Sequence, residues 1–268
     1  MRKITITMAI LLGIAYIVSC TRVPITGRRQ MNLVPESEMI SMSLTAYSDF
    51  LSQSYVLPAS DNRTQMVQRI GSNIKSACEQ FLRESGQEKR FDGFQWEFNV
   101  VEDPTVNAWC MPGGKVVVYT GILPVTQDEN SLAVVMGHEV AHAIARHGNE
   151  RMSQGLVLNA AGATLGVLMS EKPELARDIF LQSYGIGSTL GMLAYSRNHE
   201  IEADKLGLIF MAMAGYDPQA SVGFWERMSA ANGGAAPPEI MSTHPSDETR
   251  IQTLKEFMPE ALKYYKPK

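Results

Sequence analysis

Residues 134–147, VVMGHEVAHAIARH, place two histidines and a glutamate inside an otherwise apolar run. The run has the composition of a buried helix, and positions four apart on a helix share one face. His138 and His142 therefore point their rings at one place, and Glu139, one position round, can reach a water bound there. This spacing indicates two ligands of one metal ion and constrains the chain more than any other feature.

Two histidines leave a catalytic zinc site one protein ligand short, because such sites have three protein ligands and an open position. One known zinc pattern would place glycine at 145 and histidine at 148, but the chain has Ala145 and Gly148 there, with His147 one position early. The third ligand must therefore lie downstream, in the segment HEIEAD at 199–204 or at His244.

The segment HEIEAD carries three carboxylates. On a helix, Glu200 and Asp204 share a face, whereas Glu202 points to roughly the opposite side. Glu200 can bind the metal while Asp204 accepts the free ring N–H of a ligand histidine and so orients that ring. Alone, the same spacing is also typical of a solvated helix face, but the upstream pair favours the metal interpretation.

Four motifs in order along the chain resemble one known family. They are NAWCMPGGKVVVYTGIL at 107–123, HEVAH at 138–142, SRNHEIEAD at 196–204 and STHPSDETRI at 242–251. They are similar to the motifs of the HtpX-like and CaaX-prenyl-protease-like zinc metallopeptidases, metallopeptidase family forty-eight, and especially of its periplasmic quality-control members. The resemblance covers about Pro24 to the last predicted helix. It implies an α+β, mainly helical, zincin-like domain with a small β-sheet beside the active-site helix, and one Zn²⁺ per chain.

The resemblance also implies a role for individual residues. The zinc ligands would be His138, His142 and Glu200, with Glu139 as the general base and Asp204 orienting a ligand from outside the metal's coordination shell. His244 and Arg250 match a histidine and an arginine of the catalytic site. His244 matches a histidine that approaches the zinc in a latent state of some members; it can also serve an oxyanion, or only cap a turn. His147 and His199 match no ligand and are expected to be structural.

The resemblance and the strand pattern together predict a substrate-binding edge. We expect the strand at 115–119 to be the sheet edge on which an extended substrate pairs through its backbone. The candidate substrate-binding residues are Asn107, Ala108, Gly113, Gly114, Val116 and Val118.

The N-terminus, MRKITITMAILLGIAYIVSC, resembles a bacterial lipoprotein signal. Residues 1–19 are predicted to be the signal peptide, with Cys20 as the lipidated N-terminus of the mature chain. Residues 20–34 would be a lipid-anchored tether and residues 35–268 the zinc metallopeptidase domain. We expect an outer-membrane lipoprotein that faces the periplasm of a Gram-negative bacterium; an uncleaved anchor helix is the alternative.

The net charge limits the classes of binding partner, and the cysteines raise the question of a disulfide. Residues 1–19 contain two of the 24 basic and none of the 28 acidic residues, so the remainder carries a net charge of −6. This argues against a nucleic-acid partner. Cys78 and Cys110 can form a disulfide in an oxidising compartment, and Cys78 equally suits a buried thiol.

Periodicity and turn signals predict the remaining elements. Helices are expected at 35–53, 61–85, from a capping box at 126–129 to about 147, at 197–214, 218–231 and 247–262, with strands at 94–102 and 115–121 in a β-meander. Residues 152–196 predict a helical hairpin or, alternatively, a mobile lid or membrane-facing flap, and residues 233–238 a loop.

These observations predict a zinc metalloendopeptidase that hydrolyses unfolded or misassembled envelope polypeptides at a membrane. The alternative is a latent or non-proteolytic zinc lipoprotein that acts as a chaperone or assembly factor. The oligomeric state stays open.

Overall fold

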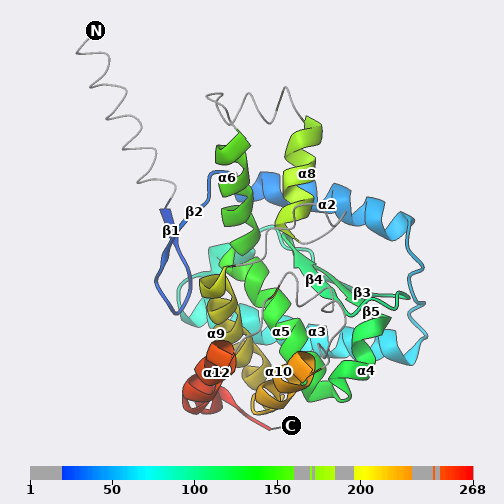
Figure 1. Ribbon diagram of the computed structural model, residues 1–268, viewed down its shortest axis with the longest axis vertical. Helices are drawn as coiled ribbons and strands as arrows, with labels where there is room; N and C mark the ends of the chain where they lie inside the picture. Colours follow the sequence, from blue (N-terminus) through cyan, green and yellow to red (C-terminus); the bar gives the residue numbers. More distant parts are fainter. Residues whose placement is uncertain are drawn as a thin grey trace.

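The computed structural model describes residues 20–159, 170, 173–184, 196–230, 244 and 248–267, and Figure 1 shows their arrangement. The predicted fold class is confirmed, because helices surround one small three-stranded sheet. The helices are α2 (Glu36–Ser52), α3 (Asn62–Glu84), α4 (Leu123–Thr126), α5 (Glu129–Ala145), α6 (His147–Asn159), α8 (Pro173–Ser183), α9 (Arg197–Met213), α10 (Ala220–Ala230) and α12 (Glu248–Ala261). Short 3₁₀ turns occupy Glu88–Phe91, Thr120–Ile122 and Leu262–Tyr264. The strands are β1 (Cys20–Arg22), β2 (Arg29–Met31), β3 (Glu97–Val101), β4 (Ala108–Met111) and β5 (Lys115–Tyr119).

The sheet differs from the predicted meander. Its order is β3-β5-β4, with β3 parallel and β4 antiparallel to β5. The prediction that residues 115–119 form an edge strand was therefore wrong: β5 is central, and the unpredicted β4 is an edge. The physical reason lies in two cores: Val116 and Val118 pack toward α3 and α5, while Val117 packs toward α2. A strand buried on both faces reads as a continuous apolar run and takes the middle of a sheet.

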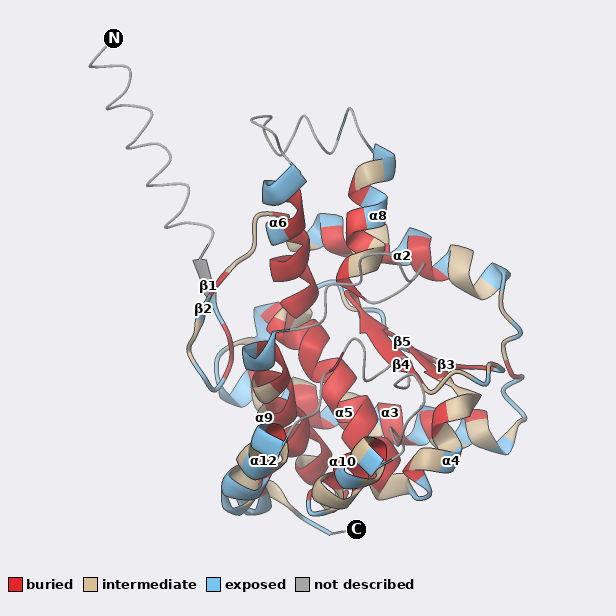
Figure 2. Ribbon diagram, in the orientation of Figure 1, coloured by how far each residue is buried: buried red, intermediate tan, exposed pale blue. Residues whose placement is uncertain are grey.

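The helix α5 runs through the middle of the domain and is buried from Ser131 to Ala145 (Figure 2). Its N-cap is Asp128, whose side chain accepts a hydrogen bond from the backbone N–H of Ser131, so the predicted capping box at 126–129 was misplaced. The helix also ends before His147, because Arg146 takes a left-handed conformation with φ of 62°. This break ends α5, and His147 begins the next helix, α6.

The helices α5 and α9 cross at two glycines. A Cβ atom built on Gly207 would lie 2.9 Å from the backbone nitrogen of His138, and one built on Gly137 would lie 2.9 Å from the carbonyl oxygen of Gly207. Only glycine permits so close an approach of two backbones. The crossing brings the HEVAH and HEIEAD segments face to face.

The residues predicted as a tether fold back onto the domain. The strands β1 and β2 pair antiparallel, with Thr21 opposite Gln30, and β2 lies against α6 (Figure 1). The turn between them contains Gly27 at φ of 66°. The hairpin thus presents Arg28 to the side of the domain on which α6 and α9 meet.

The helices α6 and α8 form the predicted helical hairpin and project side by side from the domain (Figure 1). Close contact depends on small residues: a Cβ atom on Gly148 would lie 2.0 Å from the Tyr184 ring, and one on Gly155 2.8 Å from Ile179. The alternative of a lid or flap over residues 152–196 stays a prediction, because residues 160–169, 171–172 and 185–195 of this segment lie outside the described residues.

The other predicted helices begin and end within two residues of their expected bounds. Cys78 and Cys110 are buried free thiols, which confirms the alternative without a disulfide. The predicted signal peptide at 1–19 and the loop at 233–238 lie outside the described residues. Among the helices that the structure describes, none has both the length and the apolar character that crossing a bilayer requires.

Candidate metal centre

Four buried side chains converge where α5 crosses α9. His138 and His142 come from α5 and Glu200 from the first turn of α9, and His244 joins them from the segment before α12. One ligand atom of each residue lies within 4.8 Å of the corresponding atom of every other. The structure therefore brings together the three predicted ligands, and it adds His244 to them.

The two α5 histidines turn their Nε2 atoms toward each other at 3.0 Å. His138 Nδ1 lies 2.9 Å from Asp204 Oδ1, so this nitrogen carries the proton that the carboxylate accepts. The neutral ring then has only a lone pair at Nε2. Two lone pairs aimed at one point repel each other unless a proton or a metal ion lies between them, so the two Nε2 atoms can serve as ligands of one metal ion.

The separations of the ligand atoms fit zinc. His138 Nε2 lies 3.2 Å from His244 Nδ1 and 3.4 Å from Glu200 Oε2, and His142 Nε2 lies 3.5 Å from Glu200 Oε1. Tetrahedral zinc with bonds of about 2.0–2.1 Å to nitrogen requires ligand atoms about 3.3 Å apart. The donor set of three imidazoles and one carboxylate is also one that zinc prefers.

Arg250 on α12 closes one side of the cluster. Its Nε donates to Asp204 Oδ2 at 2.6 Å, and its Nη1 lies 2.8 Å from Glu200 Oε2. Its guanidinium also stacks 3.7 Å above the ring of Trp225, on α10. Burial alone would raise the pKa of Asp204, but the charge of Arg250 and its hydrogen bond outweigh burial and lower this pKa. Arg250 thus keeps both carboxylates ionised beside the ligands.

Glu139 lies beside His244 at the cluster. Its carboxylate is buried, its Oε1 accepts no hydrogen bond from any described residue, and His244 Nε2 is 3.7 Å away. Burial raises the pKa of Glu139 above its ordinary value, against the neighbouring charges of His244 and His138. A carboxylate that is uncommitted and has a raised pKa is suited to take a proton near neutral pH.

The ligand histidines have opposite pKa shifts in the metal-free protein. Burial lowers the pKa of His142 well below its ordinary value, so this ring is neutral and ready to bind a cation. For His138, burial lowers the pKa, but hydrogen bonds to Asp204 and Glu200 outweigh it and raise the pKa to about 9. One proton therefore occupies the cluster when the metal does not.

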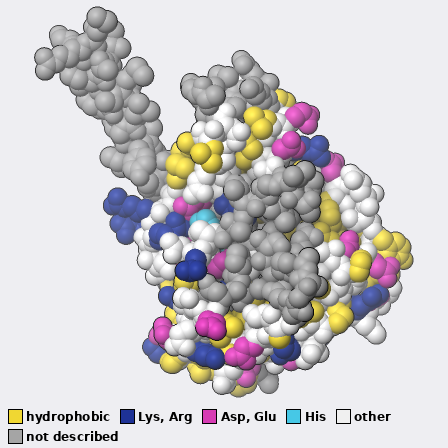
Figure 3. All heavy atoms as spheres, viewed as in Figure 1, with side chains coloured by type: hydrophobic (Ala, Val, Ile, Leu, Met, Phe, Trp, Pro, Cys, Tyr) yellow, Lys and Arg dark blue, Asp and Glu magenta, His cyan; other side chains and the backbone are white. Residues whose placement is uncertain are grey.

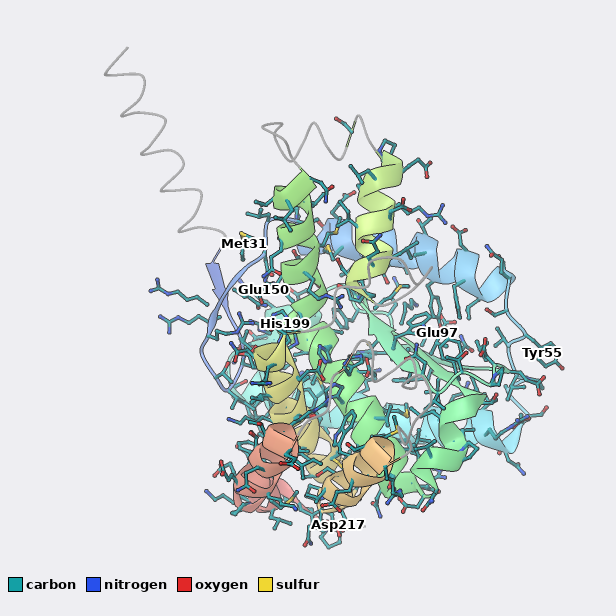
Figure 4. All side chains as sticks on the ribbon, in the orientation of Figure 1. Met31, Tyr55, Glu97, Glu150, His199 and Asp217 are labelled. Atoms are coloured by element: carbon teal, nitrogen blue, oxygen red, sulfur yellow. The ribbon has the colours of Figure 1, made fainter. Side chains whose placement is uncertain are left out.

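A second group of ionisable residues lies on the Nδ1 side of the His142 ring. The sequence alone did not predict this group. His147 Nδ1 is 3.0 Å from His142 Nδ1, and His147 Nε2 is 3.1 Å from Glu202 Oε2. Glu202 does point away from Glu200, as predicted, but into this buried group. Figure 4 shows Glu150 on α6 and His199 on α9 beside the hairpin strand that carries Met31, and His199 Nε2 is 2.9 Å from Glu150 Oε2. His147 and His199 were expected to be structural. The structure places His147 in contact with the ligand His142, and His199 stacks on His147.

The predicted substrate-binding residues divide into three groups. The side chains of Val116 and Val118 are buried in the core beneath α5, where a substrate side chain cannot contact them. Gly113 and Gly114 form the turn between β4 and β5, with φ of 81° and 80°. Ala108 begins β4, the edge strand that contacts α5, and Asn107 directly precedes it.

Comparisons with known proteins agree with this geometry. The sequence profile of peptidase family M48 matches residues 69–258. The mitochondrial metalloendopeptidase OMA1 of Schizosaccharomyces pombe is 35% identical over 254 residues, which cover 93% of this chain and 69% of the relative. OMA1 of Saccharomyces cerevisiae is 30% identical over 96% of this chain and 75% of the relative. The β-barrel assembly-enhancing protease of Escherichia coli is 31% identical over 58% of this chain and 33% of the relative.

These relatives correct the predicted localisation. The proteins that align along nearly the whole chain are mitochondrial enzymes, so the expectation of a bacterial outer-membrane lipoprotein was wrong. Two basic residues followed by an apolar run are common to several kinds of N-terminal segment, so this pattern does not identify the membrane or the compartment.

The family match, the relatives and a four-residue cluster with the spacing of zinc ligands agree with one another. The chain belongs to peptidase family M48 and is a zinc metalloendopeptidase.

Proposed function

We propose that this endopeptidase cleaves unfolded or misassembled polypeptides, which it binds in extended form along β4. The observation that carries the proposal is the position of this edge strand beside α5 and Glu139. β4 packs against α5, the helix that carries Glu139. A backbone bound to β4 would therefore pass next to the proton acceptor. Support for misassembled substrates also comes from the Escherichia coli relative, a protease named for enhancing β-barrel assembly.

The register of β4 identifies which backbone groups point away from β5. The N–H of Tyr119 donates to the carbonyl of Asn107, so the opposed residues Trp109 and Val117 also form a hydrogen-bonded pair. Ala108 and Cys110 must then direct their backbone groups to the other edge, where no described strand pairs with them. The N–H of Ala108 is taken by the Asn107 side chain at 2.9 Å. The N–H and carbonyl of Cys110 and the carbonyl of Ala108 therefore form the proposed substrate edge.

Recognition through backbone groups suits unfolded substrates. An extended chain offers its own N–H and carbonyl groups whatever its side chains are, whereas a folded protein has already paired them. We therefore expect weak side-chain selectivity and a strong preference for unfolded over folded substrates.

The proposed reaction assigns tasks to residues of the site. His138, His142 and Glu200 hold the zinc, which when bound supplies a positive charge that polarises the scissile carbonyl and acidifies water. Glu139 takes the proton of the attacking water on Oε1 and then delivers it to the leaving amine. Asp204 and Arg250 hold the ring of His138 and the carboxylate of Glu200 in place throughout.

The second candidate function is that of a latent protein, and the position of His244 supports it. Its Nδ1 lies 3.1 Å from Glu200 Oε1 and 3.2 Å from His138 Nε2, so it occupies the place that a substrate carbonyl or water would need. In this proposal His244 withdraws before cleavage. A protein that keeps His244 in place would hold zinc and bind unfolded chains without cutting them.

The decisive variant for catalysis is Glu139→Gln. We expect it to fold, to retain zinc and to lose cleavage of casein by at least about 100-fold, since general acid–base catalysis contributes 10²–10⁴-fold. Reduced and alkylated lysozyme compared with native lysozyme tests substrate choice. Equal cleavage rates for native and alkylated lysozyme would contradict the preference for unfolded substrates. A wild-type cleavage rate for Glu139→Gln would exclude the proposed mechanism.

The variant His244→Ala separates the roles of this histidine. Faster casein cleavage than wild type indicates a latent enzyme, whereas slower cleavage at unchanged zinc content indicates that His244 stabilises the reacting carbonyl. Suppression of aggregation that survives in Glu139→Gln, with no cleavage by any variant, would favour the non-proteolytic chaperone.

The proposal includes attachment to a membrane at Cys20. The support is the sequence Ile17–Cys20 after the apolar segment and the ordered hairpin that begins at Cys20. The intact mass of the purified N-terminal peptide would show acyl chains on Cys20. Cys20→Ser should then move the protein from the membrane fraction to the soluble fraction; an unmodified Cys20 would contradict this part.

A further inference from the structure

The ring of His142 is held from behind by another histidine, unlike that of His138. His142 Nδ1 contacts His147 Nδ1 at 3.0 Å, and two imidazole nitrogens at this distance need one proton between them. Since His142 binds metal through Nε2, its proton is on Nδ1 and His147 Nδ1 accepts it. His147 must then carry its own proton on Nε2 and donate it to Glu202 Oε2, 3.1 Å away. The contacts assign both tautomers.

Glu202 must stay ionised and oriented for this chain to hold, and three donors ensure this. Besides His147, the Thr26 hydroxyl donates to Glu202 Oε1 at 2.6 Å. Arg28 donates from Nε to Oε1 at 2.9 Å and from Nη2 to Oε2 at 3.0 Å. This paired geometry fixes the plane of the carboxylate as well as its charge.

Arg28 also binds Glu150, the carboxylate that accepts a hydrogen bond from the stacking partner of His147. Its Nη1 and Nη2 donate to Glu150 at 2.9 and 2.7 Å, and Glu150 accepts from His199. The ring of His199 stacks on that of His147, with centroids 4.5 Å apart and planes 20° from parallel. One guanidinium therefore ties together the hydrogen-bond partner and the stacking partner of His147.

The N-terminal hairpin supplies this guanidinium. Its turn is closed by hydrogen bonds from the N–H of Val23 to the carbonyl of Arg28, 2.9 Å, and from the N–H of Gly27 to the carbonyl of Val23, 3.0 Å. Figure 3 shows basic side chains gathered on this side of the molecule, and the hairpin contains Arg22, Arg28 and Arg29. Of these, Arg28 is the one with ion pairs to Glu150 and Glu202.

We infer that Arg28 is a positioning residue for the zinc ligand His142, acting through Glu202 and His147. The inference rests on the zinc site of the proposed function but concerns retention of the metal, not the chemical step. Residues that orient a ligand histidine from outside typically change metal affinity by 10–100-fold when they are replaced. The hairpin is thereby part of the metal centre, although it lies far from it in the sequence.

The test compares Arg28→Met with Arg29→Met, which removes the same charge from the same hairpin. We expect Arg28→Met to release zinc to a chelator about 10-fold faster than wild type, and Arg29→Met to differ by less than about twofold. Cobalt-substituted Arg28→Met should show a shifted visible absorption spectrum, since the His142 ring is reoriented, whereas Arg29→Met should show the wild-type spectrum. Circular dichroism of the metal-free proteins establishes that both are folded.

Two further variants provide an independent test and a control. Thr26→Val removes a single hydrogen bond to Glu202 and should speed zinc release in the same direction by a smaller factor, even if Arg28→Met does not fold. Glu139→Gln should retain zinc at the wild-type rate without cleaving casein, so failure of catalysis is distinguishable from failure of positioning. Zinc release and cobalt spectra that are the same in Arg28→Met, Thr26→Val and Arg29→Met would overturn the inference.

Discussion

The two sides of the zinc site are built differently. On what we term the direct side, His138 donates to Asp204, which Arg250 holds; on the relayed side, His142 reaches its carboxylate only through His147. The direct side is formed by helices packed in the core, and the Arg250 side chain is 2% exposed. The relayed side ends on Arg28, whose side chain is 26% exposed.

The two ligand histidines are thus held in place by different parts of the fold. The direct side is as stable as the packing of α5, α9 and α12. The relayed side also depends on a hairpin whose Arg28 is 174 residues from Glu202, so it can weaken without loss of the core. One side of the metal centre is therefore permanent and the other is conditional on docking of the hairpin.

Breaking the direct side should have the largest effect. Asp204→Ala leaves the buried Arg250 with Glu200 as its carboxylate partner and leaves the Nδ1–H of His138 without an acceptor. We expect the free energy of unfolding to fall by about 3 kcal/mol and zinc affinity to fall by at least about 10-fold. Urea denaturation of the metal-free protein and zinc titration measure these. Asp49→Ala, which removes an exposed ion pair with Arg177, is the control and should cost less than about 1 kcal/mol.

Forcing the two helices apart should affect both sides together. In Gly207→Ala, the new Cβ would lie 2.9 Å from the backbone at Gly137 and His138, so α9 must move away from α5. We expect a cost of about 1–3 kcal/mol and weaker zinc binding. Gly223→Ala on α10 is the matched control, because its Cβ would meet only Arg227 at 3.5 Å. Equal stability and zinc affinity in the two variants would show that the close helix crossing does not build the site.

Breaking the relayed side should cost less than breaking the direct side. Glu202→Ala removes the carboxylate that accepts from the Nε2–H of His147, but Arg28 keeps Glu150 and partial access to water. We expect a loss of about 1–2 kcal/mol, within the range for one unpaired buried donor. Because Arg28 acts through Glu202, the double variant with Arg28→Met should lose less than the sum of the two single losses. A loss as large as that of Asp204→Ala would remove the distinction between the sides.

The smallest effect is a dependence on pH that belongs to the relayed side. Burial tends to raise the pKa of Glu150, but hydrogen bonds from His199 and Arg28 outweigh it and lower this pKa to about 2, from an ordinary value of 4.5. A lowered pKa stabilises the fold above pH 4.5, and this contribution is lost as the pH falls toward 2. Glu150→Gln should therefore differ from the metal-free wild type by about 1 kcal/mol at pH 7 and progressively less at pH 4 and 3. A difference that is constant in urea denaturation across this range would contradict the assignment.

Local patterns sufficed to predict the inner part of the site. His138, His142, Glu200 and Asp204 owe their alignment to positions four apart on single helices, and this spacing is readable from the sequence. The pairing of the two helices, however, was carried only by resemblance to a family. The glycines at 137 and 207 that permit their close crossing had no distinguishing signal among the 21 glycines of the chain.

The outer part depends on features that no short pattern contains. His147 turns back toward His142 only because Arg146 leaves the helical conformation, and a periodic apolar run gives no sign of that break. Arg28 reaches Glu202 by folding of the hairpin across the domain. The central position of β5 depends on β3 and β4 pairing with its two sides. The buried run Val116–Val118 could have indicated a central strand.

The position of Arg28 near the start of the chain has a consequence for biosynthesis. Its partners Glu150 and Glu202 are 122 and 174 residues further along, so they leave the ribosome later. At 5–20 residues per second the wait for Glu202 is roughly 10–35 s. Glu150 is made before Glu202, so until the end of this time the hairpin has at most one carboxylate of the pair to bind. The first two zinc ligands, on α5, are made before either carboxylate. The nascent chain thus stays without its complete metal centre, and without the carboxylate through which Arg28 acts on His142, until Glu202 has been synthesised.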